Sequence, residues 1–332
     1  PYLSLLLGPM LFGALWAFNP LGLEPAQIKV LGVVGWMLIW WITECVPMAI
    51  TSLLPVMLFP LLGVMSLEKT CITYSNRYVF LFLGGFFIAL AMEKWNLHRR
   101  LALSIVNRTG TSANTIIFGF MLASFSISMW ISNTATTLMM LPIAASVVLL
   151  LVKPGEESSD RGTRNFATAL MLSIAYGSSI GGIATLVGSP PNASMAGILD
   201  KSFQCPVSFF TWMKYGLPFA LVFLVIAFVA MVYFIFPNRL GKFALGHELI
   251  HAELTKLGAW SREEKITFGV FISTAVLWIV QEPISTVLKP MGIEFSDTTI
   301  SIIMGSSLFL LPSKREGKQL LEWRDTAQLP WG

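Results

Sequence analysis

The stretch that decides the fold runs from residue 113 to residue 152 and reads ANTIIFGFMLASFSISMWISNTATTLMMLPIAASVVLLLV. These 40 residues contain no Asp, Glu, Lys or Arg. A helix needs only about 20 apolar residues to cross the hydrocarbon core of a bilayer, so the stretch is long enough for two helices. The polar tripeptide Ser132-Asn133-Thr134 lies near its middle. Irregular backbone at membrane depth is tolerated only where protein or water surrounds it. We therefore expect a re-entrant hairpin over 113–152 whose tip lines a binding site.

The composition of the whole chain is that of an integral membrane protein. Hydrophobic residues make up 55% of the 332 residues and charged residues only 12%, and the mean hydropathy is +0.71. A typical soluble domain carries about twice that share of charged residues. The net charge of +4 is spread over short loops, which argues against a nucleic-acid partner. The expected fold is all-α and polytopic, embedded in a lipid bilayer.

The basic residues predict how the chain is oriented in the membrane. If the first apolar segment leaves the cytoplasm, alternation places the loops 93–112, 153–164, 237–265 and 313–328 inside. These loops hold 16 of the 22 Lys and Arg residues, in agreement with the positive-inside rule. This distribution requires 113–152 to enter and leave on the same side. The hairpin is therefore expected to open from the cytoplasmic side.

Two distant parts of the chain share a pattern. Gly32-Val33 precedes Trp41-Ile42 by nine residues, and Gly269-Val270 precedes Trp278-Ile279 by the same interval. The first copy runs inward and the second runs outward. Inverted repeats of this kind are common in secondary transporters.

The hairpin tip combines two helix ends of opposite polarity. The residues from Ala135 onward read as a new helix, with Asn133 or Thr134 as its N-cap, and the partial positive charge of such a start suits an anion. The carbonyl end of the preceding helix suits a small cation. Ser128 lies four residues before Ser132, so the two hydroxyls are expected on one helical face. Together with the Asn133 amide oxygen they form an uncharged oxygen cluster suited to Na⁺. The alternative is a tip that only satisfies its own polar groups or packs between helices.

A second break is predicted at residues 187–192, VGSPPN. Gly188 permits irregular backbone, and Ser189 followed by Pro190 reads as an N-cap with Pro at the first helical position. The apolar run 165–199 is long for one span, so it is expected to be a broken helix whose second half starts at membrane depth. The alternative is a proline kink without a ligand.

A literal H-E-x-x-H motif, His247-Glu248-Leu249-Ile250-His251, raises the possibility of an intramembrane zinc protease. The spacing places both histidines on one helical face with a general-base glutamate between them. A third ligand is missing, because the remaining histidine, His98, lies about 150 residues away. A zinc site is therefore the rival hypothesis, and a non-transporting membrane scaffold is a third.

The motifs at the two breaks resemble those of the divalent anion/sodium symporter family, also called INDY-type transporters. The first is Ser-Asn-Thr followed by ATTLMMLPIA at 135–144, and the second is SIAYGSSIGG at 173–182 leading to GSPPN at 188–192. The resemblance implies a homodimeric secondary transporter of the bacterial inner membrane, and not an enzyme. It implies Na⁺-coupled symport of C4-dicarboxylates such as succinate, malate or fumarate by an elevator motion.

The resemblance also assigns residues to two ligand sites. The positions matching the first sodium site are Ser128, Ser132, Asn133 and Gly188. The positions matching one half of the substrate site are Asn133, Thr134, Ser189 and Pro190. The family has a second hairpin and a second broken helix, which this sequence lacks, so we expect it to be truncated within the second repeat.

These interpretations divide the chain into four parts. Residues 1–112 are expected to be N-terminal scaffold helices, with a basic amphipathic helix at 94–108 in the membrane interface. Residues 113–200 are expected to be part of a transport domain, containing the hairpin 113–152 and the broken helix 165–199. Residues 201–264 connect to the second repeat through helix 211–236 and a further interfacial helix, 239–257. Residues 265–332 begin the second inverted repeat.

Overall fold

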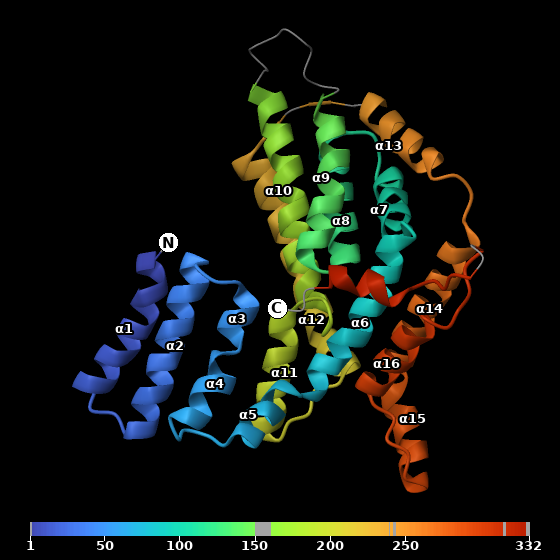
Figure 1. Cartoon of the computed structure of the whole chain (residues 1–332). Helices are drawn as coiled ribbons and strands as arrows, with labels where there is room; N and C mark the ends of the chain where they lie inside the picture. Colours follow the sequence, from blue (N-terminus) through green and yellow to red (C-terminus); the bar gives the residue numbers. More distant parts are fainter. Residues whose placement is uncertain (1, 150–160, 239, 242–243, 315–316, 330–332) are drawn as a thin grey trace. The chain divides into compact units, whose positions relative to one another are not determined.

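The computed structural model describes residues 2–149, 161–238, 240–241, 244–314 and 317–329 (Figure 1). Within these ranges the regular structure is helical, and the sole strand-type pairing is an isolated bridge between Pro312 and Gln319. Four helical stretches are long and apolar enough to cross a membrane: Pro25–Thr43, Leu67–Lys94, Arg161–Ala184 and Phe209–Ile235. A further one is the pair Arg262–Ile279 and Gln281–Met291, bent by 67°. The predicted all-α, polytopic membrane fold is confirmed.

By packing, the described residues form two compact units: one comprises the residues up to Asn76 together with Gln328 and Leu329, and the other comprises Arg77–Ala327. The first unit contains α1 (Tyr2–Phe18), α2 (Pro25–Thr43), α3 (Met48–Ser52), α4 (Leu54–Leu61) and α5 (Leu67–Tyr74). Helices α1 and α2 lie side by side, with Gly8 against the Trp36 ring and Gly32 against the Phe12 ring. A Cβ at either glycine would collide with the ring, so glycine is needed for this close packing.

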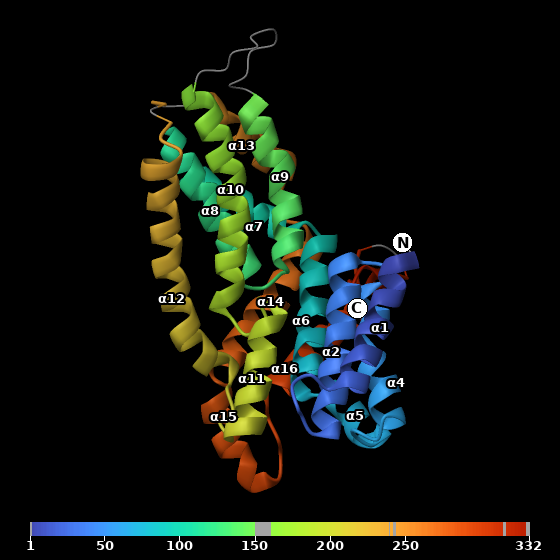
Figure 2. The same cartoon turned by 90° about the vertical axis from the view of Figure 1, so that its left-hand side faces the viewer.

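The second unit contains the remaining helices (Figures 1 and 2). They are α6 (Arg77–Lys94), α7 (Leu97–Arg108), α8 (Ala113–Ser128), α9 (Asn133–Leu149), α10 (Arg161–Ala184), α11 (Pro190–Phe203), α12 (Phe209–Val229) with a π-helical end (Ala230–Ile235), α13 (Ala244–Lys256), α14 (Arg262–Ile279), α15 (Gln281–Leu288) with a 3₁₀ turn (Lys289–Met291), α16 (Asp297–Ser307) and a last 3₁₀ helix (Trp323–Gln328). Helices α6 and α7 thus pack in the same unit as the hairpin. The expected division into scaffold and transport parts follows different boundaries and stays a prediction.

Helices α8 and α9 form a hairpin, and α10 packs against both (Figure 2). Their 16 and 17 residues correspond to about 24–26 Å each, less than a full bilayer span. Helix α10 runs parallel to α8, because Gly177 lies against the Met121 carbonyl and Gly181 against the Phe125 carbonyl. A Cβ at Gly177 would lie 2.5 Å from the Met121 oxygen. These glycines therefore allow the close packing of α8 and α10.

A charged cluster joins α7, α13 and α14. The buried Arg100 guanidinium donates to both carboxylate oxygens of Glu264, at 2.8 and 3.2 Å, and to the carbonyls of Leu257 and Gly258. Arg99 pairs with Glu253 of α13 at 2.8 Å.

The helix expected over 94–108 is observed as α7, and its place in the membrane interface stays a prediction. It begins only at Leu97, because Asn96 has a left-handed conformation with φ 56°, while Lys94 ends α6 and pairs with Asp325 at 2.6 Å. Its basic side chains Arg99 and Arg100 pair with the carboxylates of Glu253 and Glu264. The segment 239–257 contains α13 over Ala244–Lys256, and its place in the membrane interface also stays a prediction.

Candidate functional site

The first helix break is the hairpin tip. Helix α8 ends at Ser128 and α9 begins at Asn133. The Ser132 hydroxyl accepts from the Ala135 N–H at 3.2 Å, and the Ser132 carbonyl accepts from the Thr136 N–H at 3.0 Å. Ser132 is therefore the N-cap, and the prediction of Asn133 or Thr134 was wrong. The helix starts earlier than Ala135, which frees the Asn133 side chain for contacts with other helices.

Asn133 connects three helices at the tip. Its Oδ1 accepts from the hydroxyl of the buried Ser128 at 2.5 Å. Its amide lies directly on Gly182 of α10, where a Cβ would be only 2.5 Å from Oδ1. The expectation that Ser128 and Ser132 share one helical face was wrong, because α8 ends at Ser128 and Ser132 caps α9. The side chain that meets Ser128 belongs to Asn133.

The second break separates α10, which ends at Ala184, from α11, which begins at Pro190. Ser189 occupies the N-cap position in an extended conformation, with φ −152° and ψ 138°, and Pro190 follows at the first helical position. The predicted broken helix and its cap position are therefore observed. The Ser189 side chain makes no cap hydrogen bond, so its hydroxyl is not committed to α11.

Thr185 and Asn192, which sequence reasoning did not select, fasten the second break. The Asn192 amide donates to the carbonyls of Gly182 and Thr185, at 2.8 and 2.7 Å, and so satisfies the carbonyl end of α10. The Thr185 hydroxyl donates to the Met129 carbonyl at 2.5 Å and accepts from the Gly188 N–H at 3.1 Å. Both are polar residues within an apolar run, and this feature of the sequence could have identified them as candidates.

Gly182 is the point where the two breaks meet. The Asn133 side chain packs against the Cα of Gly182. Gly188 also packs against Gly182, so closely that a Cβ at Gly188 would lie 2.7 Å from the Gly182 carbonyl oxygen. Of the predicted sodium-site residues, Ser128, Asn133 and Gly188 are therefore grouped around Gly182. Ser132, Thr134 and Pro190 are exposed and Ser189 is partly exposed at the neighbouring helix starts, and no hydrogen bond links them to this group in the described residues.

Four helix ends converge here with mixed polarity. Helices α8 and α10 end with partial negative charge, and α9 and α11 begin with partial positive charge. The residues grouped between them carry no formal charge. Such an arrangement can hold a small cation at the carbonyl ends and an anion at the amide ends.

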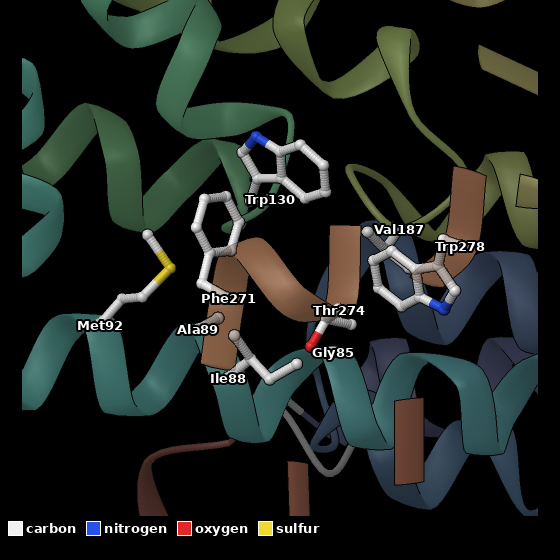
Figure 3. Close-up of a pocket in the computed structure, with 9 residues that line it drawn as sticks. All are labelled: Gly85, Ile88, Ala89, Met92, Trp130, Val187, Phe271, Thr274 and Trp278. Carbon is white, nitrogen blue, oxygen red and sulfur yellow. The ribbon is translucent and has the colours of Figure 1, made fainter. Parts of the chain in front are cut away.

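An apolar wall lies beside the two breaks. Figure 3 shows a small pocket lined by Trp130 of the tip and Val187 of the second break, facing residues of α6 and α14. The Trp130 ring is parallel to Trp278, with an interplanar angle of 2° and a centroid separation of 6.4 Å, and meets Phe271 edge-on at 4.9 Å. The lining residues are uncharged. This pocket therefore supplies packing for the tip and no ionisable group.

The zinc hypothesis gains no support. The described residues contain no group of three or more His, Cys, Asp or Glu side chains that could hold a metal ion. His251 is exposed on α13, and the His247 side chain lies outside the described residues. His98 lies in α7, with Nδ1 2.9 Å from the Met92 carbonyl oxygen.

Comparison with known proteins identifies the family. The family described as "Sodium:sulfate symporter transmembrane region" matches residues 3–332. The chain is 38% identical over 339 residues to the sodium-dependent dicarboxylate transporter SdcS of Staphylococcus saprophyticus, and 38% identical over 340 residues to SdcS of Staphylococcus aureus strain USA300. Each alignment covers 99% of this chain and 64% of the relative, so the chain spans about two-thirds of the length of these relatives. The resemblance noted at the two breaks is thereby confirmed: this membrane-embedded chain belongs to the sodium:sulfate symporter family, a family of transporters and not of enzymes.

Proposed function

We propose that the complete protein is a Na⁺-coupled symporter of C4-dicarboxylates and that this chain supplies one half of its binding site. The observation that carries the proposal is Asn133, which joins the end of α8, the start of α9 and Gly182 at the second break. The relatives named sodium-dependent dicarboxylate transporters support this substrate class.

The cation belongs at the carbonyl ends of α8 and α10. Ser128, Ser132 and Asn133 offer side-chain oxygens, and Gly188 offers its backbone carbonyl, all without formal charge. Oxygen donors are the ligands that hard cations prefer. A bound Na⁺ draws the Asn133 amide oxygen and the Ser128 hydroxyl toward one point and so orders the tip.

The substrate carboxylate belongs at the starts of α9 and α11. Asn133, Thr134 and Ser189 present polar side chains there, and the two helix dipoles favour negative charge. Pro190 has no N–H, so its part is to fix the helix start and not to donate. Coupling follows because the carboxylate binds more tightly to the tip that Na⁺ has already ordered.

The remaining parts of the proposal concern the assembly. A bacterial plasma-membrane homodimer with elevator motion, and a hairpin that opens from the cytoplasmic side, are consistent with the family and with the basic loops. Crosslinking of engineered cysteines across the dimer and labelling of the tip from each side of the membrane test these parts separately.

The decisive test is Asn133→Ala in the complete protein, reconstituted in proteoliposomes. We expect Na⁺-dependent succinate uptake to be abolished, because one substitution removes the contact between both breaks. Asn165→Ala is the matched control, since Asn165 lies near the far end of α10 and donates to the Pro237 carbonyl. Wild-type uptake by the Asn133 variant contradicts the site, and uptake by neither wild type nor control favours the non-transporting scaffold.

A further inference from the structure

Three buried hydroxyl groups behind the hairpin tip have no hydrogen-bond partner in the described part of the chain. They are Ser124 of α8, Thr136 of α9 and Ser178 of α10, with 0, 1 and 0% of their surface exposed. A buried hydroxyl without a partner costs about 1–3 kcal/mol. One such group is common in a membrane helix, but three from three adjacent helices call for an explanation.

Other hydroxyls of the same helices are satisfied by their own backbone. Ser126 donates to the Leu122 carbonyl at 2.8 Å, Thr137 to the Asn133 carbonyl at 2.8 Å, and the buried Ser173 to the Leu170 carbonyl at 2.7 Å. Bonds of this type are the usual solution for Ser and Thr within helices. The three unpartnered hydroxyls therefore differ from these neighbours in the same helices.

Helix register places these three hydroxyls in one layer. At the tip, Asn133 contacts both Ser128 and Gly182. Ser124 lies one turn before Ser128, and Ser178 lies one turn before Gly182 in the parallel helix α10. Thr136 lies about one turn after Asn133 in α9, which runs the opposite way. One turn is about 5.4 Å, so the layer lies directly behind the cluster at the tip.

The chemistry of this layer suits a cation. The groups are oxygen donors without charge, and Ser124 and Ser178 lie within the last two turns of α8 and α10, near the negative ends of these helices. We propose that Ser124, Thr136 and Ser178 form a second binding position for a small monovalent cation, one helical turn behind the tip site. It extends the sodium coupling proposed above and rests on it.

The test uses ²²Na⁺ binding to the purified complete protein, which does not require transport. A triple variant, Ser124→Ala, Thr136→Val and Ser178→Ala, is compared with a control triple, Ser126→Ala, Thr137→Val and Ser173→Ala. We expect the first variant to bind fewer Na⁺ ions per chain, and single substitutions to raise the half-saturating Na⁺ concentration about tenfold. Thr136→Ser, which keeps the hydroxyl, should bind like the wild type.

Equal Na⁺ binding by both triple variants overturns the proposal. A lower melting temperature with unchanged Na⁺ binding also overturns it, because the layer then holds only water. If the triple variant does not fold, the single variants decide by the same criterion. A failure of succinate uptake with this Na⁺ binding intact contradicts the proposed transport and not the cation position.

Discussion

Helix-end carbonyls are satisfied by neutral groups where the two helix breaks meet, and by a charged group at the corner formed by α7, α13 and α14. At both places backbone carbonyls at helix ends need partners within the protein. At the breaks the partners are neutral: the Asn192 amide and the Thr185 hydroxyl. At the corner the partner is the guanidinium of Arg100, paired with the carboxylate of Glu264.

The choice between charged and neutral partners determines whether the helix ends can still interact with a ligand. A buried charge needs a complete set of partners, and Arg100 and Glu264 satisfy each other, so this corner has no capacity left for a ligand. Neutral amide and hydroxyl partners leave the helix-end dipoles uncompensated, and these dipoles can act on an ion of either sign. The comparison suggests that charge is used where the fold must be fixed and is excluded where a ligand must bind.

Arg100→Ala should have the largest effect on stability. It leaves the Glu264 carboxylate buried without its cation, which costs about 3–5 kcal/mol. The measurement is thermal unfolding of the detergent-purified protein. The control is Arg99→Ala, whose partly exposed pair with Glu253 should contribute less than about 1 kcal/mol. Equal losses of stability for the two variants would contradict the distinction between a buried and a partly exposed ion pair.

Asp297→Asn tests a carboxylate that lies outside both the meeting point of the breaks and the Arg100 corner. The Asp297 carboxylate accepts from the Phe209 N–H at the start of α12, at 2.7 Å. Burial, aided by the nearby Glu282 charge, raises the pKa of Asp297 from 3.8 to about 6. The folded state therefore holds a proton that the unfolded chain has lost between these values. Stability from this group is fully present below pH 3.8 and is lost as the pH rises through about 6.

An asparagine at this position keeps the acceptor oxygen and removes the titration. Above pH 6 the variant should be more stable than the wild type, by at most about 3 kcal/mol, and its pH profile should be flatter between pH 4 and 6. Denaturation at a series of pH values measures both quantities. Glu294→Gln, at an exposed neighbouring position, is the control. If the stability of wild type and Asp297→Asn depends on pH in the same way, Asp297 is not the group that titrates in this range.

Asn192→Ala should have the smallest of the three effects on stability, and it tests the neutral cap directly. It leaves the carbonyls of Gly182 and Thr185 without their donor, at a cost of about 1–3 kcal/mol. The same change should weaken Na⁺ binding, because the second break loses its fixed geometry. Ser194→Ala, on the exposed side of α11, should alter neither stability nor binding. If Asn192→Ala lowers the melting temperature but not Na⁺ affinity, the cap is structural only.

Sequence reasoning located both breaks but misassigned the bonds within them. The absence of charged residues in 113–152 and the Gly-Ser-Pro-Pro sequence at 188–191 are local signals, so the hairpin and the broken helix were predictable. The cap of α9 was misplaced by one or two residues, since Ser, Asn and Thr all cap helices well and the tripeptide offers all three. Thr185 was missed because its partner, the Met129 carbonyl, lies on another segment, and Asn192 because its bonds to Gly182 and Thr185 form only when the chain folds back at the break.

The sequence by itself determined that the chain is helical, membrane-embedded and broken at two points, because hydropathy, helix length and proline chemistry act over a few turns of one segment. Only the tertiary structure decided that Asn133 reaches both Ser128 and Gly182, and that Arg100 pairs with Glu264. These contacts depend on which faces of distant helices pack together. The spacing of Gly177 and Gly181 marks a face for close packing, but it does not encode that α8 is the helix that packs there.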